Sequence, residues 1–119
     1  MPLPMPEPPP TPSPNPGDAL FRALADPTRR ALFERLCRDG TATVVELTDG
    51  AGVSQPVVSK HLAKLKGAGL VSAHPEGRAT RYRAEPAALA PLVDWTEQMA
   101  AFWAGRFTAL DTLLNRMDQ

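Results

Sequence analysis

A helix-forming stretch over residues 50–70, GAGVSQPVVSKHLAKLKGAGL, constrains the fold most strongly. Gly50 and Gly52 provide a turn, Ser54 stands where an N-cap belongs, and Pro56 is tolerated in the first turn of a helix. At 100° per residue the apolar side chains then gather on one face and the polar ones on the other. We expect the apolar face to lie in a core and the polar face to meet an extended polar partner. The apolar face carries Val58, Leu62 and Leu65.

The polar face of this helix has the chemistry of a DNA reader. Gln55 and Ser59 lie near its N-terminal end, the region of a major-groove helix that contacts bases. The whole chain has a formal net charge of zero, which alone disfavours nucleic-acid binding. Its charge is unevenly distributed, however, because residues 54–83 hold six Lys and Arg residues against one acid, Glu76. A local basic patch is what phosphate attraction requires.

Three shorter helices are expected ahead of this stretch, over residues 17–25, 27–38 and 43–51. Asp26 and the proline after it end the first helix and cap the second. The one cysteine, Cys37, adjoins the apolar stripe of the second helix, so we expect a buried, unreactive thiol and no intrachain disulfide.

A β-hairpin is expected after the long stretch. Residues 70–73 and 80–84 are short strand candidates, and the turn residues 74–77 separate them. By the two-residue period of a strand, Arg81 and Arg83 share one face. The hairpin is therefore basic.

A long helical pattern occupies residues 86–119, where apolar residues recur at spacings of three and four. A domain this small cannot cover so broad an apolar face, so we expect it to pack against a second copy of the chain. The residues of this segment expected at the homodimer interface are Leu92, Met99, Trp103, Leu110, Leu113 and Leu114.

The N-terminal segment contains nine prolines in residues 1–16. We expect residues 1–17 to form a proline-rich disordered arm and residues 18–118 to form one domain. The arm is read as a solvated tail or, alternatively, as a segment lying along a partner subunit or DNA. The sequence shows no membrane span and no secretory signal, so we expect a cytoplasmic protein.

Three segments, FRALADPTRRALFERL, VSQPVVSKHLAKLKGAGLV and GRATRYR, occur in this order. Together they resemble the ArsR/SmtB family of dimeric winged-helix transcriptional regulators, over residues 18 to 118. The resemblance implies a mainly α fold with a β-hairpin wing, a winged helix-turn-helix that dimerises through its first and last helices. It therefore adds Leu20 and Phe21 of the first helix to the residues expected at the dimer interface. It implies that the fourth helix reads the operator. The residues assigned to double-stranded DNA are Ser54, Gln55, Pro56, Ser59, Lys60, His61, Lys64, Arg78 and Arg81, with His61 open to packing or a DNA-backbone contact.

The metal sites of that family are not intact in this chain. Metal sensors often carry Cys-x-Cys on the helix before the recognition helix, but residues 44–52 hold neither Cys nor His. A second family site begins with Asp-x-His in the last helix, and here Asp94 is followed by Thr96. We therefore expect no metal and no cofactor, since a transition metal needs several converging ligands.

The function expected is that of a sequence-specific DNA-binding transcription regulator, a repressor acting as a homodimer on promoter DNA. One alternative is a nickel-, cobalt- or zinc-responsive regulator of this fold with non-standard ligands, or control by an unidentified small effector. Another is a protein-interaction module that uses the proline-rich arm. An enzyme is not expected, because no Ser/His/Asp set, paired buried carboxylates or phosphate-cradling glycine loop is present.

Overall fold

The computed structural model describes residues 3–4 and 16–117. Most of the proline-rich arm expected at 1–17 therefore lies outside the described residues, although the first helix already begins at Pro16. The chain forms α1 (Pro16–Ala25), α2 (Pro27–Asp39), β1 (Thr41–Thr43), α3 (Val44–Thr48), α4 (Gln55–Gly67), β2 (Val71–Glu76), β3 (Ala79–Ala84), the 3-10 helix η1 (Pro86–Leu89) and α5 (Ala90–Met117).

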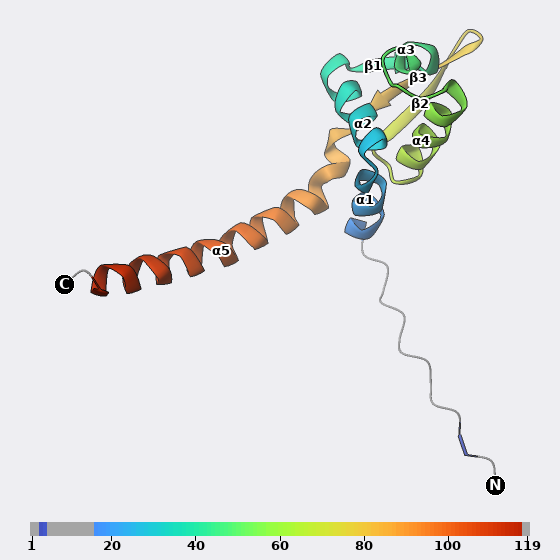
Figure 1. Ribbon diagram of the computed structural model, residues 1–119. Coiled ribbons are helices and arrows are strands. Elements are labelled where there is room, and N and C mark those ends of the chain that lie inside the picture. Colours follow the sequence, from blue (N-terminus) through green and yellow to red (C-terminus); the bar gives the residue numbers. More distant parts are fainter. Residues whose placement is uncertain (1–2, 5–15, 118–119) are drawn as a thin grey trace.

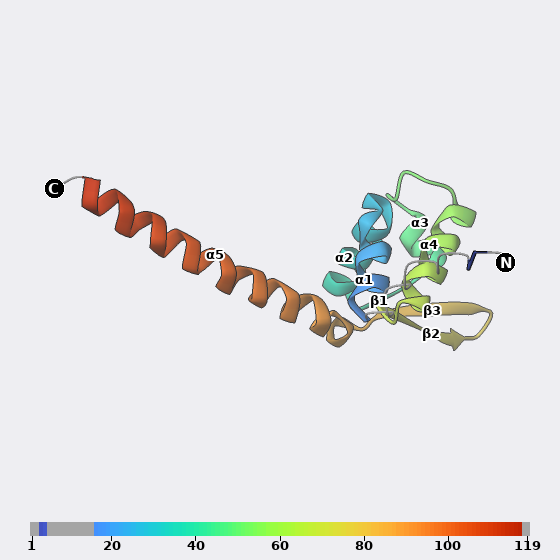
Figure 2. The ribbon, with the colours of Figure 1, turned by 90° about the horizontal axis from the view of Figure 1, so that it is seen from below.

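Helices α1 to α4 pack together beside a small antiparallel sheet with the strand order β1-β3-β2 (Figure 1). The β2–β3 hairpin projects from one end of this unit, and α5 leaves it as a long single helix (Figures 1 and 2). Helix α5 contacts the rest of the chain through α1 and η1, near its own beginning. The expected mainly α fold with a β-hairpin wing is confirmed.

One hydrophobic core joins the helical unit to the sheet. The expected inward faces of α2 and α4 are confirmed, because an apolar stripe at helical spacing must be removed from water. Each strand of the sheet contributes one buried residue to the same core. The buried core residues are Leu20, Ala23, Leu32, Phe33, Leu36, Ala42, Leu47, Val58, Leu62, Leu65, Leu70, Val71 and Ala84.

A helix was expected over residues 43–51, and these bounds are wrong. Strand β1 precedes it and pairs with β3, and α3 covers only Val44–Thr48. Thr43 has extended backbone angles and its side chain accepts a hydrogen bond from the backbone N–H of Glu46, so it is the N-cap where the helix begins. The pairing partner of β1 lies about forty residues away in sequence, beyond the reach of local periodicity.

The expectation that Cys37 is buried is wrong, because this thiol is exposed. It follows the buried Leu36 by one residue, and a step of 100° turns its side chain away from the core. Partial desolvation and, after it, the Glu34 carboxylate raise the pKa of the Cys37 thiol above its ordinary value. The thiol thus stays protonated near neutral pH.

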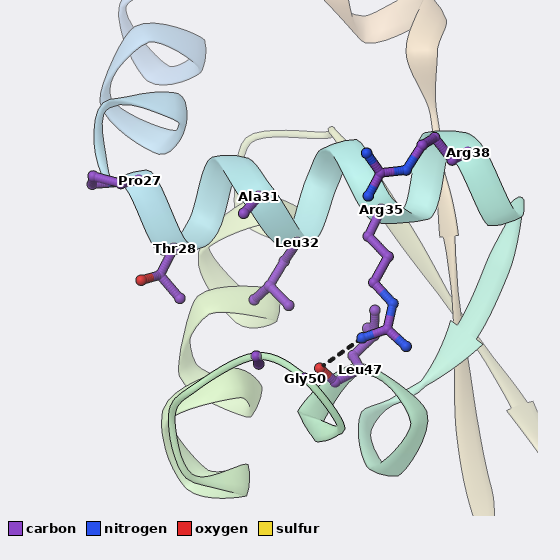
Figure 3. Close-up of a pocket in the computed structure, with 9 residues that line it drawn as sticks. Pro27, Thr28, Ala31, Leu32, Arg35, Arg38, Leu47 and Gly50 are labelled. Carbon is purple, nitrogen blue, oxygen red and sulfur yellow. Dashed lines mark hydrogen bonds between the residues drawn. The ribbon is translucent and has the colours of Figure 1, made fainter.

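Arg35 on α2 fixes the end of α3. Its guanidinium donates hydrogen bonds to the carbonyl oxygens of Glu46 (2.9 Å), Leu47 (3.2 Å) and Asp49 (2.7 Å). Carbonyls at a helix C-terminus have no partner within the helix, so a guanidinium satisfies them well. Figure 3 shows the side chain reaching from α2 to Leu47, beside a cavity of about 350 Å³ between α2 and the turn at Gly50. This bond set holds α3 against α2.

In the described part of the chain, no helix combines the length and the apolar character that crossing a bilayer requires.

Two neighbouring valines on α4 test the burial that orients this helix. Val58 is fully buried, whereas Val57 is 38% exposed. We expect Val58→Ala to lower the free energy of unfolding by about 2 kcal/mol, from lost apolar burial and the cavity left behind. Val57→Ala is the matched control, since both changes raise helix propensity equally. Urea unfolding measures the difference, and equal losses from the two variants would contradict this orientation of α4.

Candidate nucleic-acid interface

Helix α4 carries most of the side chains that the sequence assigns to DNA. Each of these α4 residues except His61 is exposed. Pro56, Lys60 and Lys64 point away from the buried stripe of the helix, and Gln55 and Ser59 flank that outer face. Ser54 occupies the N-cap position, but its side chain makes no cap hydrogen bond, so its hydroxyl remains available to a partner. The exposed set is Ser54, Gln55, Pro56, Ser59, Lys60 and Lys64.

Strands β2 and β3 form the hairpin and are longer than expected, with the turn at Gly77 and Arg78. His74 therefore lies within β2 rather than in the turn. The register pairs Ser72 with Arg83 and His74 with Arg81. Arg81 and Arg83 share one sheet face, as expected. Tyr82 and Ala84 face the core, so the two arginines lie on the outer face.

The hairpin and α4 border a common hollow. Gln55 from the first turn of α4 and Arg78 from the hairpin turn both line a cavity of about 300 Å³, together with Val45 of α3. The Gln55 amide and the Arg78 guanidinium thus converge from two elements that are separate in sequence. Val45 is 67% exposed there. Sequence reasoning did not assign it a role, although an exposed branched apolar side chain suits a thymine methyl group.

Electrostatics separates the basic residues of this face into two groups. Lys60, Lys64, Arg78 and Arg83 are exposed and form no ion pair with any described residue. Their charges are available to phosphate groups. Arg81 differs, because it contacts the carboxylates of two acidic residues, and its side chain is only one-third exposed.

His61 is also set apart from the other α4 residues. Its Nδ1 accepts a hydrogen bond from Nε of Arg29 (3.4 Å), and its Nε2 lies 4.0 Å from a carboxylate oxygen of Asp26. The side chain is only 14% exposed. This position, against the start of α2, favours packing over a DNA-backbone contact.

A second surface, along α5, is apolar rather than basic. Phe21 of α1 and Trp95 of α5 meet edge to face with ring centroids 5.2 Å apart. Trp95 was not among the expected interface residues, although it lies about five helical turns before Leu113, on the same side of α5, and its ring contacts that of Phe21. The apolar side chains left exposed along α5 are Val93, Trp95, Met99, Phe102, Trp103, Phe107, Leu110, Leu113, Leu114 and Met117.

One residue expected at the dimer interface lies elsewhere, and a second is partly covered by its own subunit. Leu20 is 3% exposed and belongs to the core of its own subunit, so its assignment to the interface is wrong. Leu92 is half-buried against the same core. Both residues lie where α1 and the start of α5 meet the helical unit, and the subunit itself covers Leu20 almost completely and Leu92 in part. The remaining interface candidates on α5 are open to a partner.

Within residues 3–4 and 16–117 of one subunit, no three or more His, Cys, Asp or Glu side chains gather closely enough to hold a metal ion.

Known proteins resemble this chain in sequence and fold. Residues 24–72 match a family model described as a helix-turn-helix domain. The helix-turn-helix-type transcriptional regulator Rv2034 of Mycobacterium tuberculosis is 40% identical over 98 residues, which cover 82% of this chain and 88% of that protein. An ArsR-like transcriptional regulator from Rhodococcus sp. RHA1 has a TM-score of 0.65 at 32% identity, over 81% of this chain and 90% of its own.

A further solved structure bears on assembly. It is a homodimeric winged helix-turn-helix DNA-binding domain from Mycobacterium bovis, described as a possible ArsR-family transcriptional regulator. It is 27% identical to this chain, with a TM-score of 0.58 over 72% of this chain and 79% of its own.

The N-cap of α2 predicts an acid-sensitive contribution to stability. The backbone N–H of Arg29 donates to the Asp26 carboxylate (3.0 Å) and lowers the pKa of Asp26, and the charges of His61 and Arg29 lower it further. The ionised form is therefore favoured in the folded state. Its contribution is present above the unfolded pKa of about 4 and is lost as the pH falls through the lower folded pKa.

The test compares the chain with Asp26→Asn, which keeps a capping oxygen but does not titrate. We expect the stability advantage of the unaltered chain over this variant to shrink as the pH falls below about 4. Denaturant unfolding at a series of pH values measures it. A difference that stays constant from neutral to acidic pH would refute the ionised cap.

The apolar face of α5 predicts an association that a buried charge disrupts. We expect Leu113→Glu to weaken self-association at least about tenfold, because an unpaired carboxylate would be desolvated at the interface. Thr112→Glu is the matched control, as it adds the same charge one residue away, off the apolar stripe. Sedimentation equilibrium measures both, and an unchanged association constant for Leu113→Glu would rule out this face as the interface.

Proposed function

Because the chain belongs to the ArsR family of winged helix-turn-helix transcriptional regulators, we propose that it represses transcription by occupying promoter DNA as a homodimer. Helix α4 enters the major groove, and the β2–β3 wing lies along the adjacent backbone. The one observation that carries this assignment is the shared hollow of α4 and the wing, which brings Gln55 and Arg78 together.

The exposed residues of α4 divide into two roles. Lys60 and Lys64 are exposed and form no ion pair with the residues that the structure describes, so they contact phosphates and fix the position of the domain on the duplex. Gln55 and Ser59 have donors and acceptors near the N-terminal end of the helix, where base edges are within reach. Ser54 and Pro56 flank this end and complete the surface.

Repression follows from geometry. A two-fold dimer places two copies of α4 in successive major grooves, about 34 Å apart. A complex of that span covers promoter DNA and blocks access to it. The effect needs binding alone, so we assign a binding rather than a catalytic function. We place the protein in the cytoplasm, where promoter DNA would be accessible to it.

The predicted phosphate contacts have a salt signature. We expect Lys60→Ala to weaken operator binding and to lower the slope of log K against log salt by about one. Footprinting on the DNA upstream of the protein's own gene supplies the operator, because regulators of this kind commonly bind there. Titrations from low to high salt then give the slope.

Gln55→Ala serves as the control in the same titrations. It removes a base contact and no charge, so we expect weaker discrimination between operator and random DNA at an unchanged salt slope. Binding that does not depend on salt in the unaltered protein would contradict the proposed function.

A further inference from the structure

Arg81 is the point where four elements meet. It lies on β3, the central strand of the sheet. Its Nε donates to Oε2 of Glu76 on β2 (2.5 Å), and its Nη2 lies 3.7 Å from Oε1 of Glu46 on α3. Its Nη1 also donates to the Thr41 hydroxyl on β1 (3.4 Å). One guanidinium thus joins the wing to the first helix of the helix-turn-helix.

The α3 end of this connection is itself fixed in place. Thr43 and Glu46 form a capping arrangement, in which the Glu46 backbone N–H donates to the Thr43 hydroxyl and that hydroxyl donates to Oε1 of Glu46 (both 3.2 Å). The same carboxylate oxygen faces Arg81. The cap therefore holds the carboxylate at a defined place on α3, and Arg81 transmits that placement to the sheet.

The charge at this junction disfavours a phosphate. Two carboxylates surround one guanidinium, so the local sum is negative. The hydrogen bond and charge of Glu76, with the smaller effect of Glu46, raise the pKa of Arg81 and keep it charged and paired. Arg83 lies two residues further along the same face, is exposed, and has no ion pair with any described residue. A DNA backbone would therefore meet Arg83 without displacing a carboxylate.

We propose that Arg81 is a positioning residue, which sets the wing relative to α3, and that Arg83 joins Arg78 as a phosphate contact of the wing. The sequence alone assigned Arg81 to DNA and left Arg83 out. This inference rests on the proposed function. The tie from Arg81 to Glu46 keeps Arg78 beside Gln55, so that wing and recognition helix meet DNA as one rigid surface.

The test compares Arg81→Gln with Arg83→Gln, which remove the same charge from the same sheet face. We expect Arg83→Gln to lower the salt slope of operator binding by about 0.9, the value for one lost phosphate contact. We expect Arg81→Gln to weaken binding about threefold with the slope unchanged, because only an exposed ion-pair network is lost. Any fall in slope for Arg81→Gln would overturn the proposal.

A second measurement needs no DNA. Amide hydrogen exchange in residues 71–84 should be faster in Arg81→Gln and in Glu46→Gln, unchanged in Arg83→Gln, and restored in part by Arg81→Lys, which keeps the charge but not the fork. Unchanged exchange in both Arg81→Gln and Glu46→Gln would also overturn the proposal. Salt-independent DNA binding by the unaltered protein would defeat the proposed function alone, since the exchange measurement tests the tie separately.

Discussion

Complete burial of one face of α4 determines the direction of nearly every side chain that we assign to DNA. Val58, Leu62 and Leu65 are all removed from water, so the helix cannot rotate without exposing apolar surface. Because this face is fixed against the core, the side chains of Lys60 and Lys64 must point toward solvent. Arg35 holds the preceding helix α3 against α2, and this contact in turn fixes the turn that leads into α4. Recognition is thus a consequence of packing.

A chain with no net charge presents a basic surface because folding sorts its charges. The acids that lie near the wing in space, Glu46 and Glu76, are engaged with Arg81. Lys60, Lys64 and Arg83 are left without carboxylate partners among the described residues. The electrostatic potential of the DNA-facing surface therefore depends on which charges are already paired within the subunit. The net charge of the whole chain is a poor guide to that potential.

Much of this fold was predictable from the sequence, because the apolar stripes of α2 and α4 are local and repeat at the helical period. Strand β1 was not predictable in that way, since its partner β3 is remote in sequence. Periodicity identifies an apolar face but not its cover, so Leu20 was assigned to a partner subunit although its own core covers it. Arg81 was assigned to DNA because the resemblance places it on the wing, and the sequence could not reveal its contact with Glu46, which forms only in the folded chain.

Helix α5 projects from the subunit with most of its apolar side chains open (Figures 1 and 2). A helix of this kind is stabilised by packing more than by its own helix propensity. The formation of α5 is therefore coupled to the dimerisation of the subunits. The occupied promoter then depends on the square of the subunit concentration when dimers are scarce. A twofold change in synthesis becomes about a fourfold change in the DNA-binding species. The exposed helix thereby gives the regulator a sharper response to its own abundance than a monomer would have.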